Sequence, residues 1–122
     1  MKYMLLCYDD DQAWARAGNG ARERAMQEAV HLTHQVHAKG QYLLAAPLRP
    51  VETATSVRVR DGKRLITDGP FAETREVLGG FYLIDVNNLD EAIEIAARHP
   101  GARVGTVEVR PVIEIPGLPA GQ

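Results

Sequence analysis

Two helical segments set between short apolar runs are the feature that most constrains the fold. Residues 21–39 contain neither Gly nor Pro and are rich in Ala, Glu, Arg, Met and Gln, which predicts one long helix ended by Gly40. Asn88 and Glu91 have the spacing of a capping box, and Pro100 ends the second helix. Apolar or alternating runs flank these helices and predict strands at residues 3–8, 42–46, 55–60, 63–67, 81–86 and 104–110.

The order of these elements predicts a fold class. Asp61-Gly62 between two short strands indicates a β-hairpin, so the chain reads strand-helix-strand, hairpin, strand-helix-strand. This order predicts an α+β, ferredoxin-like (split βαβ) antiparallel sheet with two helices on one face. We expect a domain over residues 1–112 and a Pro/Gly-rich tail over residues 113–122, which either adds an edge strand or contacts a partner.

Apolar residues on both sides of the first strand predict self-association. Met4, Leu6 and Tyr8 alternate with Tyr3, Leu5 and Cys7, so the face of the sheet away from the helices is also apolar. An uncovered apolar face on a small protein favours a partner surface. We therefore expect a homodimer in which two sheets face each other.

Composition narrows the class of protein. The 122 residues carry a net charge of -2, which argues against a nucleic-acid or membrane-surface partner. The single cysteine excludes an intramolecular disulfide and a cysteine-based zinc site. The first apolar run is too short to span a membrane and lacks a signal-peptide cleavage pattern. We expect a cytoplasmic single-domain protein without a cofactor.

Residues 68–76 carry the strongest chemical signal. Asp68 is followed by Gly-Pro, so it is either a turn residue bonded to the backbone or a carboxylate acting as acid/base at a cleft. Phe71 is expected to anchor the core or a cleft wall. Glu73 and Arg75 are either solvated surface charges or a substrate clamp, with Arg75 binding an anion and Glu73 moving a proton. Gly79-Gly80 predicts a bulge or a close backbone approach.

The histidines give a weaker signal. His31, His34 and His37 spread over the long helix, and their spacing does not match a metal-binding pattern, so we expect no metal site. His37 alone lies at the boundary of the buried side and stays a weak catalytic candidate. His99 ends the second helix, where a cation would suit the helix dipole.

Several segments resemble the YCII-related proteins, and specifically the subgroup named for its Asp-Gly-Pro-Phe (DGPF) motif. The resemblance rests on residues 1–6, 67–74, 78–84, 89–92 and 107–111, and runs from Met1 to about Val112. It implies a ferredoxin-like fold that dimerises as an α-β barrel. Resemblance to the wider YCII-related group implies a small enzyme with a proposed pair of functional residues, one His and one Asp. None of the three histidines of the long helix matches the histidine of that pair cleanly. Some members are encoded beside extracytoplasmic-function sigma factors, which implies a regulatory link.

Two functions of different classes remain open from the sequence. The first is a small cofactor-independent enzyme or small-molecule-binding protein, with Asp68 as acid/base in a pocket near the dimer interface. Arg75 and Glu73 would orient the ligand, and Tyr82 would line the pocket if its side of the strand faces inward. The alternative is a non-catalytic regulatory or interaction protein linked to a sigma factor.

Overall fold

The computed structural model describes residues 1–119. Its strands are β1 (Lys2–Asp9), β2 (Tyr42–Pro47), β3 (Thr55–Arg60), β4 (Lys63–Asp68), β5 (Val77–Asp85) and β6 (Gly105–Pro111). Its helices are α1 (Asp11–Arg16), α2 (Ala21–Ala38), α3 (Leu89–Arg98) and α4 (Gly101–Val104), with a 3-10 turn η1 at Val51–Thr53. Every predicted strand and both predicted long helices are present, with β5 beginning four residues earlier than expected.

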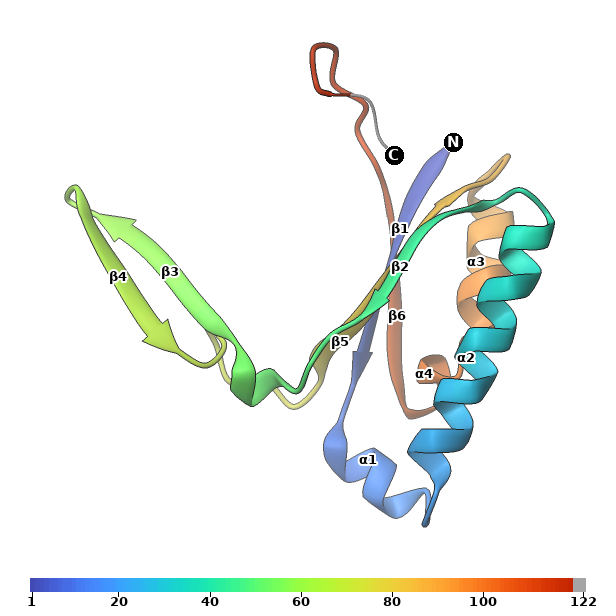
Figure 1. The fold of residues 1–122 in the computed structure, drawn as a ribbon, viewed down its shortest axis with the longest axis horizontal. Coiled ribbons are helices and arrows are strands. Elements are labelled where there is room, and N and C mark those ends of the chain that lie inside the picture. Colours follow the sequence, from blue (N-terminus) through green and yellow to red (C-terminus); the bar gives the residue numbers. More distant parts are fainter. Residues whose placement is uncertain (120–122) are drawn as a thin grey trace.

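Four strands form one antiparallel sheet in the order β2-β5-β1-β6. β1 pairs with β5 on one side and with β6 on the other, and β2 pairs with the outer side of β5. The helices α2 and α3 cover one face of this sheet (Figure 1). This arrangement confirms the predicted α+β, ferredoxin-like fold.

The core lies between the sheet and the two long helices. Leu5, Ile84 and Val36 are its largest fully buried side chains, and they come from β1, β5 and α2. On α2 the buried side chains are Ala25, Leu32 and Val36, whereas Met26 and Val30 are exposed. On α3 the buried side is Ala92, Ile95 and Ala96. Ile93 and Ala97 also belong to the apolar content of this helix, but they are exposed.

Gly79 and Gly80 of β5 show both features that the sequence predicted as alternatives, a bulge and a close backbone approach. The β1–β5 register shifts between Cys7 and Tyr8, which leaves Gly79 as the extra residue of a bulge. A Cβ atom on Gly80 would lie 3.1 Å from the carbonyl oxygen of Ala46. The backbone of β2 therefore approaches β5 closely at this point, because glycine leaves room for it.

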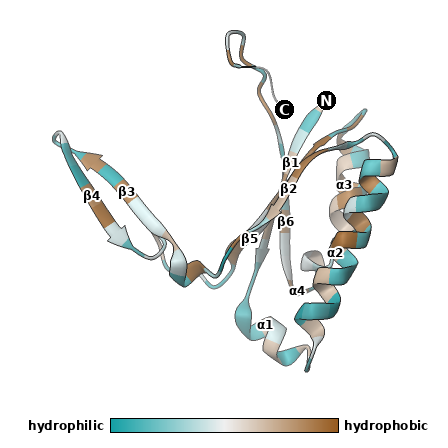
Figure 2. Ribbon diagram, viewed as in Figure 1, coloured by the Kyte–Doolittle hydropathy of each residue, from teal (hydrophilic) through white to brown (hydrophobic). Residues whose placement is uncertain are grey.

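The β3–β4 hairpin forms a separate two-stranded sheet that projects from the body (Figure 1). Its turn residues Asp61 and Gly62 both have positive φ, as the tight turn of an Asp-Gly hairpin requires. Val57 and Ile66 face each other across the strands and are 62% and 58% exposed. The hairpin thus presents an exposed apolar face, visible as brown bands in Figure 2.

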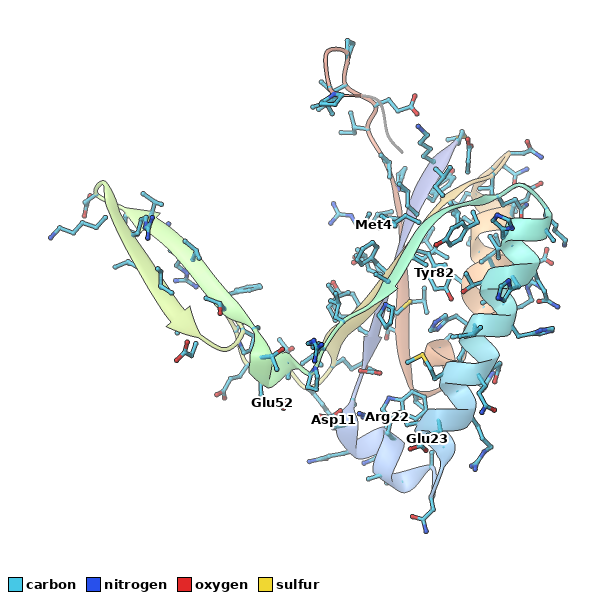
Figure 3. The ribbon with its side chains drawn as sticks, in the orientation of Figure 1. Met4, Asp11, Arg22, Glu23, Glu52 and Tyr82 are labelled. Carbon is cyan, nitrogen blue, oxygen red and sulfur yellow. The ribbon has the colours of Figure 1, made fainter. Side chains whose placement is uncertain are left out.

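The sheet face opposite the helices is apolar over β2, β5 and β1, where cross-strand pairing places Met4, Leu6, Leu44, Ala46, Phe81 and Leu83 on it. The edge strand β6 adds Thr106, Glu108 and Arg110 to the same face. Figure 3 shows Met4 pointing away from the helices, whereas Tyr82 points toward them. Within the described residues no helix covers this face (Figure 1). None of the helices in residues 1–119 has both the length and the apolar character needed to cross a membrane.

Candidate functional site

A cavity of about 520 Å³ opens between the sheet and α2. Alanines of α2 and β2 leave space there that larger side chains would fill, and most of the exposed wall is apolar. Its lining includes Ala25, Met26, Ala29, Val30 and Thr33 of α2, together with Cys7, Tyr42, Ala45, Gly80 and Tyr82 of the sheet. Among the other lining residues are Trp14, Pro100 and Gly101, and the acidic, basic and histidine side chains of the wall are Asp9, Asp11, Arg22, His34, Arg49 and His99. A concave, mainly apolar space with a few polar groups is typical of a small-molecule site.

His99 is the most distinctive polar group in this wall. It is the residue at the C-terminal end of α3, and its Nδ1 accepts a hydrogen bond of 2.9 Å from the backbone N–H of Gly101. Its Nε2 lies 4.0 Å from Sγ of Cys7, and its ring packs edge-on against Tyr82 at 5.6 Å between centroids. Burial lowers the pKa of His99 below its ordinary 6.5. A cation would suit the helix dipole here, but the packing of this helix end against Cys7 and Tyr82 favours the uncharged ring.

Cys7 contributes a neutral thiol to the same place. It lies on the helix-facing side of β1, and its burial together with the charge of Asp9 raises its pKa from 9.0 to about 11. At neutral pH the group is a thiol rather than a thiolate. Cys7 belongs to the core cluster and also lines the cavity.

Tyr82 and Thr33 link the sheet to α2 across the cavity floor. The Tyr82 hydroxyl lies 2.8 Å from Oγ1 of Thr33 and also donates to the carbonyl oxygen of Ala29 at 3.3 Å. Thr33 in turn donates to the Ala29 carbonyl at 2.7 Å. Burial is the main cause of the raised pKa of Tyr82. The phenol is therefore protonated and holds α2 in place, so the ring rather than the hydroxyl is what faces a ligand.

Asp9 is one of two carboxylates that line the cavity, the other being Asp11, which is paired with Arg22. Asp9 is the last residue of β1, and its Oδ2 accepts a 2.8 Å hydrogen bond from the indole Nε1 of Trp14. A Cβ atom on Gly79 would lie 3.3 Å from Oδ1 of Asp9, so the bulge glycine lets the carboxylate lie against β5. Trp14 also lies under the guanidinium of Arg22, which pairs with Asp11 at 2.7 Å (Figure 3).

The residues predicted from the Asp-Gly-Pro-Phe motif lie elsewhere. Asp68 ends β4 at the base of the hairpin, where it is exposed and pairs with Thr55. Gly69 has the positive φ expected of the turn, but within the described residues the Asp68 carboxylate accepts no hydrogen bond from the backbone. Phe71 is 78% exposed, and Glu73 is also exposed. The turn is held through the backbone of Gly69, which donates to the Ala54 carbonyl at 2.7 Å and accepts from the Ser56 hydroxyl at 2.8 Å. The motif does not line this cavity within one chain.

Arg75, His37 and Tyr82 have separate surroundings. Arg75 donates from Nε to Oδ2 of Asp10 at 2.9 Å, so it is already engaged within the chain. His37 is exposed on α2 and packs edge-on against Tyr42 at 5.8 Å. Tyr82, whose strand side faces inward, is the predicted site residue that lines the cavity.

Sequence reasoning missed His99 and Asp9 as members of one site. Ninety residues separate them, and each stands at the end of an element where capping is the usual explanation of its chemistry. Among residues 1–119 there is no group of three or more His, Cys, Asp and Glu side chains that could hold a metal ion. The signal that could have found the site is the pairing of small residues in α2 and β2, which leaves space between helix and sheet.

The fold and the cavity together define an α+β protein with a ferredoxin-like sheet and a helix-side pocket. The sequence matches the YCII-related domain over residues 1–116, and the chain belongs to this family. It is also 37% identical over 114 residues to an uncharacterized protein of Rhizobium meliloti (strain 1021), a match that covers 92% of each chain.

Proposed function

We propose that this protein is a small cofactor-independent enzyme or small-molecule-binding protein whose site is the cavity between α2 and the sheet. The observation that carries the proposal is the convergence of His99 and Asp9 on one apolar space of about 520 Å³. Both groups are held by hydrogen bonds to their own neighbours, Gly101 and Trp14. Polar groups positioned in an apolar wall can orient a ligand and stabilise charge on it.

A cavity-filling substitution tests the proposal. Ala29 lines the cavity from α2, and Ala29→Leu places a larger side chain in the space while keeping a good helix former. Ala97→Leu on the exposed side of α3 is the matched control. In a thermal-shift screen of ring carbonyl compounds, phenols, organic acids and metal ions, we expect a compound that stabilises wild type and Ala97→Leu but not Ala29→Leu. A compound that stabilises all three proteins equally binds outside the cavity and contradicts the proposal.

We also propose that the protein is a homodimer. One chain has two exposed apolar surfaces, the outer sheet face and the hairpin face. In a symmetric pair, the hairpin face of each chain would cover the outer sheet face of the other. Leu83→Glu puts a charge on the outer sheet face, and Ile93→Glu puts one on the exposed side of α3. Light scattering during gel filtration should show that only Leu83→Glu yields monomers. If Leu83→Glu remains dimeric, the outer sheet face is not the interface.

In the proposed dimer, Asp68 of one chain could take part in the site of the other chain. The hairpin projects on the side of the sheet away from the helices, so the Asp68 of one chain lies toward a second copy seated there (Figure 1). If Asp68 is an acid/base of the site, Asp68→Asn should abolish the ligand-induced thermal shift without changing the melting temperature of the unliganded protein. A lower unliganded melting temperature with an unchanged ligand shift would assign Asp68 to structure alone.

The second candidate function is a regulatory or interaction protein, with the proposed link to a sigma factor. The observation that favours it is Phe71, which is 78% exposed beside an apolar hairpin. Phe71→Ser should then weaken capture of a purified extracytoplasmic-function sigma factor without affecting ligand binding. Equal capture by Phe71→Ser and wild type would count against the role. For either function we propose a cytoplasmic location.

A further inference from the structure

We propose that His99 serves the cavity as an uncharged hydrogen-bond donor, and that the ligand presents a carbonyl or phenolic oxygen to its Nε2–H. This inference rests on the proposed function of the cavity and names the class of ligand. It assigns Gly101 as a positioning residue that acts through the imidazole ring.

The hydrogen bond from Gly101 decides which nitrogen of His99 carries the proton. A backbone N–H can only donate, so Nδ1, at 2.9 Å from it, must present a lone pair. A neutral imidazole then carries its single proton on Nε2. An imidazolium would have a second N–H facing the Gly101 N–H, and the bond would be lost.

The surroundings of the ring favour the same uncharged form. Burial among Cys7, Tyr82 and the end of α3 lowers the pKa of His99. Of the charged groups that face it, Glu28 of α2 and Asp9 of β1 raise that pKa, and Arg103 of α4 lowers it. Glu28 and Arg103 neutralise each other through two bonds of 2.9 and 2.7 Å. That pair also ties α4, and with it Gly101, to α2.

Two competing roles for His99 do not fit this geometry. A cysteine–histidine nucleophile needs a base to take the thiol proton, but Nε2 is already protonated and the pKa of Cys7 is about 11. A metal ligand at Nε2 needs that nitrogen bare, which would put the ring proton on Nδ1 against the Gly101 N–H. The remaining role is that of a hydrogen-bond donor to the ligand through Nε2–H, as in enzymes where a neutral histidine polarises a carbonyl.

The ligand class follows from what Nε2–H faces. Its nearest acceptor among the described residues is the Cys7 sulfur at 4.0 Å, which is a weak acceptor. An oxygen atom entering the cavity would make a better hydrogen bond. The charge of Asp9 acts on His99 and so disfavours a carboxylate at this end, whereas an uncharged carbonyl or a phenol avoids the repulsion. Of the arginines in the wall, Arg22 is already paired with Asp11. The apolar remainder of the wall suits a ring or short hydrocarbon body.

The tautomer is tested on the full chain labelled with ¹⁵N-histidine. Long-range ¹H–¹⁵N spectra at neutral pH should show His99 with a bare Nδ1 and a protonated Nε2. In Gly101→Ala, a Cβ atom would lie 3.0 Å from Nδ1, so the ring must shift and the two tautomers should mix. An Nδ1–H tautomer or an imidazolium in the wild-type protein at neutral pH overturns the proposal.

The ligand class is tested with acetophenone and ethylbenzene, which differ by the carbonyl oxygen. Wild type should bind acetophenone roughly fivefold to tenfold more tightly, the usual strength of one hydrogen bond. His99→Gln, which keeps an N–H near the Nε2 position, should retain part of this preference, and His99→Leu should lose it. Equal binding of both probes by wild type, or a preference that survives in His99→Leu, would overturn the ligand class.

These outcomes separate the inference from the proposed function. If the cavity binds compounds that Ala29→Leu excludes but the carbonyl preference is absent, the cavity proposal stands and the role of His99 is wrong. If neither probe binds wild type at millimolar concentration, the ligand class is wrong, and the wider screen on Ala29→Leu decides the cavity independently.

Discussion

Arg75 donates from Nε to Oδ2 of Asp10 at 2.9 Å, across 65 residues of sequence. The contact joins the segment that leads out of the hairpin to the turn between β1 and α1. The Asp10 carboxylate also accepts from the backbone N–H of Gln12 and so begins α1. One carboxylate therefore holds both the start of α1, which carries the cavity residue Trp14, and the Asp-Gly-Pro-Phe segment.

The ion pair gives the first prediction. The hydrogen bond from Arg75 is the main cause of the lowered pKa of Asp10, so its stabilisation is present above the ordinary value of 3.8 and is lost as the pH falls through the native value. Arg75→Ala should lower the melting temperature at neutral pH, and the deficit should shrink as the pH falls below 3.8. Arg64→Ala, on the exposed hairpin, is the control and should change neither the melting temperature at neutral pH nor its dependence on pH. A deficit that stays constant with pH would contradict the ionic origin.

The second prediction concerns the reactivity of Cys7. A thiol whose pKa rises from 9.0 to about 11 holds about 100-fold less thiolate at neutral pH, and burial slows access further. Native protein should therefore resist iodoacetamide at neutral pH, while the protein in guanidinium chloride reacts at the rate of an ordinary thiol. Mass spectrometry over time measures both rates. Rapid alkylation of the native protein would contradict the assignment of Cys7 as a buried, neutral thiol.

The third prediction is an acid dependence that comes from His99. Because burial lowers the native pKa below the unfolded 6.5, the unfolded chain takes up the proton first as the pH falls. The stabilisation is thus complete above 6.5 and is lost as the pH falls through the native value. Urea unfolding should show that His99→Gln flattens the fall in stability below 6.5. Gln35→Ala on the exposed side of α2 should keep the wild-type slope, and an unchanged slope in His99→Gln would refute the assignment.

The fourth prediction concerns Gly105, at the start of β6. Its φ of -163° is ordinary extended backbone, but a Cβ atom there would collide with the backbone carbonyl oxygen of Tyr8. Gly105→Ala must push β6 away from β1, and we expect a loss of about 1–3 kcal/mol in the free energy of unfolding. Thr106→Ala, the next residue and exposed, should cost little by comparison. Equal losses in the two variants would mean that the strands can separate without strain.

The features that could be predicted from the sequence are those that depend on residues close together in the chain. Helix and strand positions followed from periodicity, and the hairpin followed from Asp61-Gly62, because these signals depend on neighbours in the chain. Local signals also placed Asn88 at the start of α3, where its side chain accepts from the Glu91 N–H. They also predicted the ferredoxin-like order of elements, since few topologies join two such units.

The site needed the tertiary structure because its groups act at a distance along the chain. Read alone, His99 is a helix-end cation, and only its packing against Cys7 and Tyr82 makes it an uncharged ring. Asp68 shows the converse, since its motif is conspicuous in sequence yet stands on an exposed hairpin. The sequence by itself determined the elements and their order through local propensity. Packing alone decided which titratable groups share a cavity, because desolvation and hydrogen-bond geometry exist only once distant segments meet.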